Sequence, residues 1–313
     1  MTAFFKTTAW AKCILAGEHT VLRGFPALVM PVHHKTMTLA YQSDSCFEIV
    51  SNVLELRQAF LNVLQRACGQ LGKQLEKVNG RFCLNSHIPM GSGIGFSAAL
   101  CVVITRWLIA QGWLAAHELF HFAHRLEDLF HGKSSGLDVA GALSDQLIAY
   151  TIGGGIRLID VAWKPLLYLS YSGVPKNTQA AIEKVNSLRL QDSDLGQEID
   201  QQMHASVQEI EQALRQKEGL KLLQQMMNRA RSCFHAWGLI SLPLQTHLDQ
   251  LSNLGALAAK PTGAGEGGYV LSLWQEVPPP SSGIDFIPIT YSLHTPSSSG
   301  YVKKSEITEV LTC

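Results

Sequence analysis

In several segments of this chain apolar residues recur every three to four positions, and this spacing predicts helices. Residues 54–72 carry apolar side chains every three to four positions up to Gly69 and Gly72, as in an amphipathic helix. The run 98–111 is apolar on nearly every side, which predicts a buried central helix. Helical spacing also predicts helices over 117–130, 197–216 and 219–237.

Short runs rich in branched residues, bounded by glycine and proline, predict strands between these helices. The expected strands are 12–16, 27–32, 36–41, 80–85, 146–151, 156–161, 166–171, 269–274 and 286–292. Between about 176 and 237 the chain becomes polar and prone to form helices, so we place a domain boundary near residue 175. An α/β fold with an N-terminal domain over 1–175 and a C-terminal domain over 176–313 is therefore expected.

Charge and cysteine content narrow the class of protein. The 313 residues are 46% hydrophobic, and 25 lysine and arginine residues balance 25 aspartate and glutamate residues. Because no global field attracts polyanions, we expect neither a nucleic acid nor a membrane partner. The seven cysteines form no Cys-x-x-Cys pair, which favours reduced thiols and a cytoplasmic protein.

A glycine-rich run between residues 88 and 100 leads directly into the predicted central helix. Gly91, Gly93 and Gly95 allow backbone turns and leave no side chain between an amide and a ligand. A helix beginning near Ser97 would direct its unpaired N–H groups and its positive dipole end at this loop. The junction predicts a phosphate site, although an ordinary turn before a buried helix would share the pattern.

Charged residues near two other turns suggest further parts of a site. Lys12 precedes a short apolar run that ends in Glu18 and His19. Glu127 lies near the C-terminal end of a predicted helix, where the dipole disfavours a carboxylate unless a cation such as Mg²⁺ compensates it. Asp138 follows eleven residues later as a base toward a hydroxyl, or as a helix cap. Taken singly, each of these residues also suits a plain surface or capping role.

A second glycine cluster extends from Lys260 to Gly268 and leads into a predicted strand. Two such loops, together with separated lysine and carboxylate candidates, favour a nucleotide-dependent transferase. The stretch from His117 to His121 offers a competing interpretation, because it satisfies the His-Glu-x-x-His pattern of zinc proteases. It lacks an evident third ligand, so a zinc hydrolase remains the minor alternative.

Three segments together resemble the kinases named for galactokinase, homoserine kinase, mevalonate kinase and phosphomevalonate kinase. The first is 12–24, the second, 89–99, resembles Pro-x-Gly-x-Gly-Leu-Gly-Ser-Ser-Ala-Ala, and the third is 260–268. Within the family, Gly-Glu-His-Thr-Val at 17–21 and His-Gly-x-x-Ser-Gly-x-Asp at 131–138 are most similar to the mevalonate kinase members. The resemblance implies an N-terminal half like ribosomal protein S5 domain 2, a ferredoxin-like C-terminal half, and an active site between them.

The resemblance also assigns roles to residues of this chain. Asp138 would accept the proton of the attacking hydroxyl, and Lys12 would steady the developing charge. ATP phosphates would lie on Pro89, Gly91, Ser92, Gly93, Ile94, Gly95, Phe96 and Ser97, and Mg²⁺ on Ser97 and Glu127. The acceptor, mevalonate or a related small hydroxy acid, would contact Glu18, His19, Thr262, Gly263, Ala264 and Gly265.

Three departures from the family pattern leave alternatives open. Trp10-Ala11 replaces a Pro-Gly pair, Phe96 replaces the first serine of the second motif, and Glu266 replaces a glycine of the third. A carboxylate beside bound phosphate is repulsive unless it turns away or pairs with a cation. Phosphomevalonate kinase, another kinase of the family, and a catalytically weak binding protein are therefore retained as alternatives. The chain could also form a homodimer.

Overall fold

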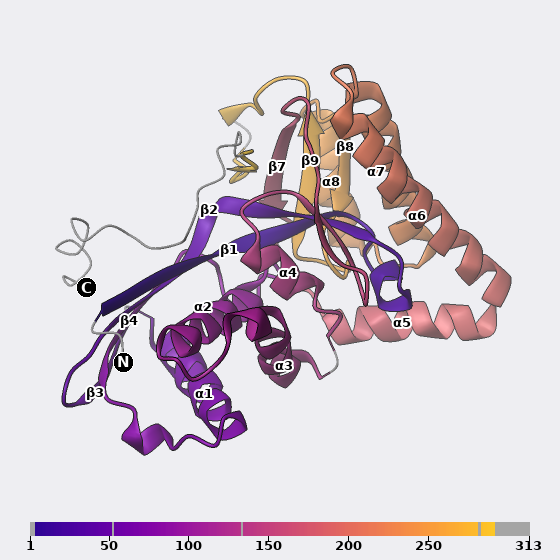
Figure 1. Ribbon diagram of the computed structural model, residues 1–313. Helices are drawn as coiled ribbons and strands as arrows, with labels where there is room; N and C mark the ends of the chain where they lie inside the picture. The colour runs from indigo at the N-terminus through magenta and orange to yellow at the C-terminus, as the bar shows by residue number, and fades with distance from the viewer. Residues whose placement is uncertain (1–3, 52, 133, 281–282, 292–313) are drawn as a thin grey trace.

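The computed structural model describes residues 4–51, 53–132, 134–280 and 283–291. It contains two β-sheets, each covered by its own group of helices (Figure 1). Two long strands, β1 (Phe4–Ala16) and β2 (Ala27–Gln42), run between the two parts of the molecule. Among the described residues no helix is both long and apolar enough to cross a bilayer.

The first sheet is six-stranded, in the order β3-β4-β2-β5-β6, with β1 paired to β2. Its pairs are antiparallel except for β3 and β4, which are parallel because α1 (Leu54–Gln70) connects them. The remaining strands are β3 (Phe47–Ser51), β4 (Gly80–Ser86), β5 (Ile148–Thr151) and β6 (Gly155–Leu158).

An irregularity in the β1–β2 pairing explains why the sequence suggested two separate strands at 27–32 and 36–41. Ala11 pairs with Val32 whereas the preceding Trp10 pairs with Thr36, so residues 33–35 bulge from a single strand. Such a bulge bends the strand and re-aims its side chains. It places His33 at the junction with the second sheet.

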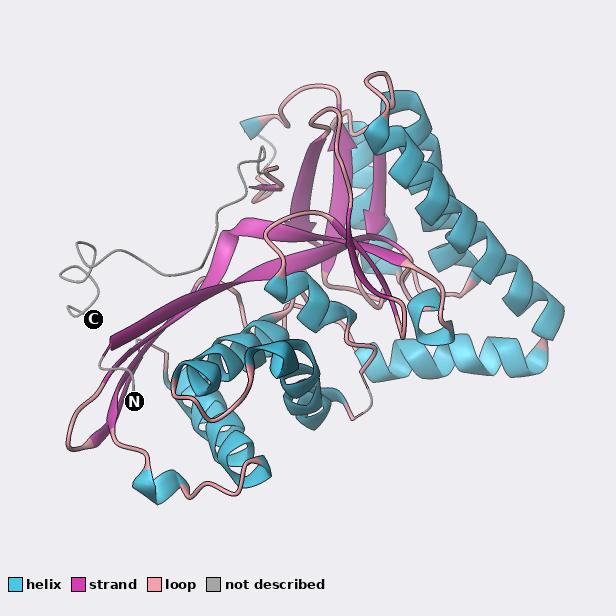
Figure 2. Cartoon of the chain, in the orientation of Figure 1, coloured by secondary structure: helices cyan, strands magenta, loops and turns pink. Residues whose placement is uncertain are grey.

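Four helices pack around the first sheet (Figure 2): α1, α2 (Phe96–Ala110), α3 (Leu119–His131) and α4 (Leu137–Leu143). Eleven of the fifteen residues of α2 are buried, as its uniformly apolar sequence predicted. Both α2 and α4 contact β1. Short 3₁₀ helices lie at Thr20–Arg23, Leu75–Lys77 and Ala116–Glu118.

The second sheet has the order β10-β7-β9-β8 and is antiparallel. Its strands are β7 (Leu166–Tyr171), β8 (Ala258–Pro261), β9 (Tyr269–Trp274) and β10 (Ile287–Pro288). The helices of this part are α5 (Thr178–Gln191), α6 (Ser193–Arg215), α7 (Leu220–Ala236) and α8 (Leu242–Asn253). Strand β7 begins at Leu166 and pairs within this second sheet. A boundary drawn between the two sheets would therefore lie before Leu166, and the domain boundary near 175 stays a prediction.

Several elements differ from those expected. The closing strand expected at 286–292 is described only as β10, and Ser292 lies outside the described residues. Five short or polar elements had no predicted bounds: β3, β8, α4, α5 and α8. Capping signals were present for two of them, since Asn177 accepts a hydrogen bond from the Ala180 amide of α5 and a proline occupies the first turn of α8.

Candidate active site

A buried lysine and a carboxylate form the centre of the candidate site. Lys12, on β1, is 1% exposed, and its Nζ lies 2.8 Å from Oδ1 of Asp138 in the first turn of α4. Helix α4 approaches β1 closely because Gly141 has no side chain: a Cβ there would lie 2.9 Å from Lys12 Cβ. The Asp138 side chain is 31% exposed, so one end of this ion pair remains accessible to a ligand.

The glycine loop of the second motif wraps around the same lysine. Gly91, Gly93 and Gly95 have φ values of 71°, 81° and 93°, a region that favours glycine. The Lys12 amide donates to the Ile94 carbonyl at 2.8 Å, and Lys12 Nζ lies 3.4 Å from the Gly93 carbonyl oxygen. Gly95 caps α2, so the positive end of a buried helix, the N–H groups of its first turn and Lys12 occupy the same place.

The side chains of this loop and of the first turn of α2 differ in burial and in their contacts. Phe96 is buried in the main hydrophobic core at the first residue of α2, so the family's hydroxyl position is here a core contact. The Ser92 hydroxyl donates to the Pro89 carbonyl at 2.7 Å, which holds the turn before the helix. Ser97 is only partly buried in the same first turn.

Glu127 is a buried carboxylate whose electrostatic neighbours include Asp138 and Lys12. It lies on α3 and is 1% exposed, with the Ser134 hydroxyl 3.4 Å from its Oε2. Burial, with the charge of Asp138 as a second cause, raises the pKa of Glu127 to about 8. A carboxylate in this environment suits a divalent cation, whose charge would offset both effects.

The described residues provide few side-chain ligands for a metal ion that binds without phosphate. Within them no group of three or more His, Cys, Asp or Glu side chains is arranged to hold one. Mg²⁺ typically binds one or two carboxylates and completes its octahedron with phosphate oxygens and water, so the buried Glu127 carboxylate fits that mode, and the role of Ser97 stays a prediction. The His-Glu-x-x-His stretch is interrupted, because His117 and Glu118 lie in a 3₁₀ turn and His121 lies on α3.

A second lysine, which the sequence reasoning missed, faces the glycine loop from the other sheet. Lys176 follows β7, and its Nζ lies 3.5 Å from the Gly93 carbonyl oxygen. A Cβ on Gly93 would come within 2.2 Å of the Lys176 side chain, and one on Gly263 within 3.4 Å of its Nζ. Desolvation, followed by the nearby charge of Lys12, lowers the pKa of Lys176 to about 8. An isolated loop lysine shows no periodic signal, so only the fold reveals its position.

The third motif, residues 260–268, forms hydrogen bonds with the C-terminal end of β1. The Thr262 hydroxyl accepts a hydrogen bond from the Ile14 amide at 2.7 Å and donates to the Ile14 carbonyl at 3.0 Å. Lys260 Nζ lies 2.5 Å from Oε1 of Glu18, and both side chains are at most 1% exposed. These contacts join the first sheet to the β8–β9 loop.

His19 makes a further contact with the β8–β9 loop. Its Nε2–H donates to the Ala264 carbonyl at 2.9 Å. Burial lowers the pKa of His19 to about 4, so the ring is neutral near pH 7. The contacts of Glu18, His19, Thr262, Gly263, Ala264 and Gly265 with an acceptor stay predictions, because this structure pairs Glu18 with Lys260, Thr262 with Ile14 and His19 with Ala264.

The Glu266 carboxylate pairs with a lysine of α5. Its backbone occupies the position of a glycine with a φ of 63°, and its carboxylate lies 3.3 Å from Nζ of Lys184 on α5. Its amide donates to the Leu239 carbonyl at 2.7 Å. The negative charge of Glu266, which the sequence suggested would lie beside bound phosphate, is therefore paired with Lys184.

The structure brings the glycine loop, the buried lysine and the accessible aspartate together, and known proteins similar to this chain are small-molecule kinases. Residues 56–146 match the family model described as the GHMP kinases N terminal domain. This match confirms the predicted resemblance and the expected class of enzyme, an ATP-dependent small-molecule kinase.

The curated relatives point to one branch of that family. A mevalonate kinase of Aeropyrum pernix is 27% identical over 87% of this chain and 89% of its own length. A mevalonate kinase of Thermococcus gammatolerans is 26% identical over 86% and 89%.

Solved structures confirm the fold. The mevalonate kinase of L. major in complex with R-mevalonate has a TM-score of 0.76 at 22% identity, covering 88% of this chain and 90% of that one. The mevalonate kinase of Methanococcus jannaschii has a TM-score of 0.71 at 19% identity, covering 91% and 97%. The α/β fold class expected from the sequence is therefore confirmed.

Proposed function

We propose that this chain transfers the γ-phosphoryl group of ATP to the hydroxyl of mevalonate, giving 5-phosphomevalonate. The observation that carries the proposal is the ion pair between Lys12 and Asp138 beside the glycine loop, at 2.8 Å. Phosphoryl transfer requires mainly positioning and neutralisation of charge, and this arrangement supplies both. The similarity to mevalonate kinases over most of the chain supports the choice of acceptor.

Asp138 and Lys12 would act on the reacting hydroxyl. Asp138 is accessible, so its carboxylate can accept the proton of an acceptor that enters beside it. Lys12 holds that carboxylate in one orientation and presents a positive charge where the attacking oxygen becomes negative. Because Lys12 is buried against α4 and the Ile94 carbonyl, its position costs no reorganisation during the reaction.

The triphosphate would lie on the loop from Pro89 to Ser97. The amides at the start of α2 and the ammonium groups of Lys12 and Lys176 would share its charge. Lys176 comes from the second sheet, so it would contact the phosphates or the acid group only while the two sheets are held together.

Glu127 and Ser97 would hold Mg²⁺, which would neutralise charge on the β- and γ-phosphates when bound. The fit rests on the buried Glu127 carboxylate, which the described protein groups compensate only in part. A cation at this position would also keep Glu127 ionised near pH 7.

Replacing the proposed base tests this function. Asp138→Asn should lower kcat for mevalonate about 10³-fold, within the range of general base catalysis, and leave the Kd for ATP within a few-fold. Asp160→Asn, at an exposed aspartate away from the loop, is the matched control and should keep full turnover. Unchanged turnover of Asp138→Asn would refute the base assignment.

The acceptor is tested separately, by measuring ADP release with mevalonate, phosphomevalonate, galactose and homoserine. Mevalonate should give the largest kcat/KM. Release with phosphomevalonate alone would favour the alternative kinase. If ATP bound but no acceptor raised the rate, the chain would be a binding protein on this fold.

Cytoplasmic location and a homodimer remain parts of this proposal. Cys13, Cys46, Cys68, Cys101 and Cys233 are free thiols, which supports a reducing compartment. A sedimentation measurement tests the dimer.

A further inference from the structure

The helix that carries Asp138 is too short to hold its own position. Helix α4 has seven residues, whereas an isolated helix needs roughly 12–15 residues before it is even marginally stable in water. Asp138 lies in its first turn, and the ends of a helix are the parts that fray. The orientation of Asp138 toward Lys12 therefore depends on contacts that other elements make with the two ends of α4.

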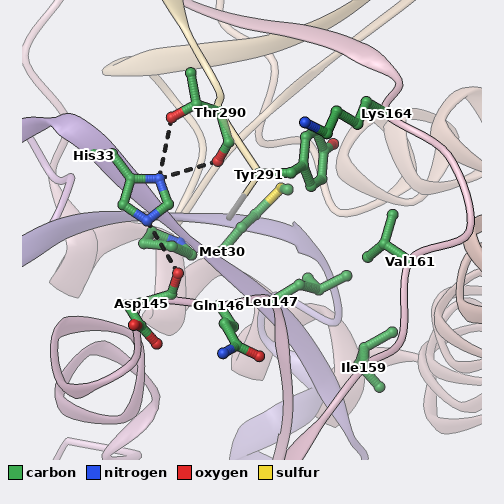
Figure 3. A pocket seen from close by; sticks show the side chains of 11 residues that line it. Met30, His33, Asp145, Gln146, Leu147, Ile159, Val161, Lys164, Thr290 and Tyr291 are labelled. Carbon is green, nitrogen blue, oxygen red and sulfur yellow. Dashed lines mark hydrogen bonds between the residues drawn. The ribbon is translucent and has the colours of Figure 1, made fainter. Parts of the chain in front are cut away.

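The C-terminal end of α4 is held by two side chains from other elements. Arg106 of α2 donates to the carbonyl of Leu143, the last residue of the helix, at 3.5 Å. Asp145 follows, and its carbonyl oxygen lies 3.0 Å from Nε2 of His33. Figure 3 shows His33 between Asp145 and Thr290, so this end is tied to the bulge of β2 and to the chain after β10. These contacts fix the end of α4 that is farther from the reacting centre.

The N-terminal end of α4, next to Asp138, is held by Tyr150. Tyr150 lies on β5, is 4% exposed, and donates its hydroxyl to the Ser135 carbonyl at 2.7 Å. The next residue, Gly136, is the N-cap of α4 and has a φ of 80°. A Cβ on Gly136 would lie 2.8 Å from the Tyr150 hydroxyl oxygen, so this hydroxyl also lies against the cap. Burial, followed by the charge of Glu127, raises the pKa of Tyr150, so its hydroxyl stays protonated and can donate.

Helix α3 holds the same loop at the preceding residue. The Ser134 amide donates to Oδ1 of Asp128 at 2.8 Å, and Nε2–H of His124 donates to the Ser134 carbonyl at 3.1 Å. The Ser134 hydroxyl lies 3.4 Å from Oε2 of Glu127. The loop would therefore stay attached to α3 without Tyr150, and only the part that leads into α4 would be released.

We propose that Tyr150 is a positioning residue for phosphoryl transfer. It holds the turn at Ser135 and Gly136, and this turn orients Asp138 toward Lys12 and toward the hydroxyl of the acceptor. The inference rests on the proposed kinase function and deepens it. Because a displacement of about 1 Å at a reacting group can lower the rate about 10²-fold, the anchor matters more to turnover than to stability.

The experiment compares Tyr150→Phe with Tyr41→Phe. Tyr41 is 3% exposed and donates its hydroxyl to the Asn79 carbonyl at 2.9 Å, so it makes the same kind of bond to a loop of the same sheet. It pairs with Phe5 near the start of β1, and Lys12 lies toward the other end of that strand. Each variant loses one hydrogen bond of a buried tyrosine, so both should lower the Tm by a similar few degrees.

Only Tyr150→Phe should slow turnover. We expect kcat with mevalonate to fall about tenfold, less than for a full displacement, because α3 still holds the loop. KM for mevalonate and the Kd for ATP should stay within about twofold, since neither ligand loses a contact. Tyr41→Phe should keep the wild-type kcat. In an Asp138→Asn background, Tyr150→Phe should change the residual kcat less than about twofold, because the group that it positions is already removed.

Hydrogen exchange tests the anchor independently of turnover. The amides of Leu137 and Ala140 are hydrogen-bonded at the start of α4. They should exchange about tenfold faster in Tyr150→Phe than in the wild type, and at the wild-type rate in Tyr41→Phe. The Ser134 amide should keep its rate in both variants, because α3 still holds it.

Three results would overturn the proposal: unchanged exchange at Leu137 and Ala140 in Tyr150→Phe, an unchanged kcat in that variant, or an equal loss of kcat in Tyr41→Phe. An undiminished effect of Tyr150→Phe in the Asp138→Asn background would also overturn it, since Tyr150 would then not act through Asp138. A wild-type protein that turned over no acceptor would instead refute the kinase function, and the exchange rates would still decide whether Tyr150 holds the turn.

Discussion

Among the residues that the structure describes, two lysines are almost completely buried, and each is paired with a carboxylate, but the two pairs differ in what surrounds them. Lys12 pairs with Asp138, whose side chain is 31% exposed and stands beside the glycine loop. Lys260 pairs with Glu18, and neither side chain is more than 1% exposed. The first pair can reach a ligand, whereas the second contacts only the protein.

The residues of the shared motifs have different roles around the two lysines. Motif residues around Lys12 leave a charged group accessible, which is a requirement for chemistry. Motif residues around Lys260 form hydrogen bonds between β1 and the β8–β9 loop, as Thr262 does with Ile14. The second group therefore holds the sheets in the relative position that brings Lys176 to the glycine loop.

The largest expected effect comes from removing each lysine in turn. Lys260→Met leaves Glu18 buried without its cation, and breaking such a pair costs about 3–5 kcal/mol of unfolding free energy. Lys12→Met leaves Asp138 with access to water and should cost about 1 kcal/mol or less, while lowering kcat at least about 10²-fold. Urea unfolding and steady-state kinetics measure the two quantities.

A double variant controls this comparison. Glu18→Gln with Lys260→Met removes both charges and should recover part of the lost stability. If folded Lys260→Met lost as much kcat as Lys12→Met, while keeping its stability, Lys260 would belong to the reacting centre and the distinction between the pairs would be wrong.

A smaller effect is expected at Lys176, which joins the two regions. Its pKa of about 8 means that the ammonium form falls from roughly nine-tenths at pH 7 to one-tenth at pH 9. Affinity for an anionic substrate is present below that pKa and lost above it, so kcat/KM should fall about tenfold over this range. Lys176→Arg should keep its charge and flatten the pH profile, whereas Lys176→Met should be low throughout. A wild-type profile matching that of the Arg variant would contradict this role.

The sequence predicted much of the fold because long apolar patterns are local. Helix α2 and strands such as β7 and β9 follow directly from their side-chain periodicity. Helix α4 was foreseen only as the alternative in which Asp138 caps a helix, because seven residues carry too little of the pattern, and in the structure Gly136 is the cap. The bulge at His33 was missed because register depends on the partner strand. The sheet that β7 joins is likewise a property of distant residues.

For the site, motifs identified residues but not their surroundings. Lys12 and Asp138 were named from the sequence, and the structure brings them within 2.8 Å. Lys176 lacked any motif signal, and the burial of Glu18 could not be anticipated from its position in a Gly-Glu-His turn. Burial depends on packing between segments more than two hundred residues apart, such as Glu18 and Lys260.

The smallest expected effect concerns Glu266, the residue that made a weak kinase conceivable. Its φ of 63° costs about 1–2 kcal/mol for a residue with a side chain, while its partly exposed pair with Lys184 contributes at most about 1 kcal/mol. Glu266→Gly should therefore raise the Tm slightly, by a few degrees or less, and leave kcat within twofold. Lys184→Met is the control, since it breaks the ion pair without relieving the backbone. A large gain in kcat for Glu266→Gly would show that the carboxylate does disturb the phosphates, and the separation of this loop from the reacting centre would have to be abandoned.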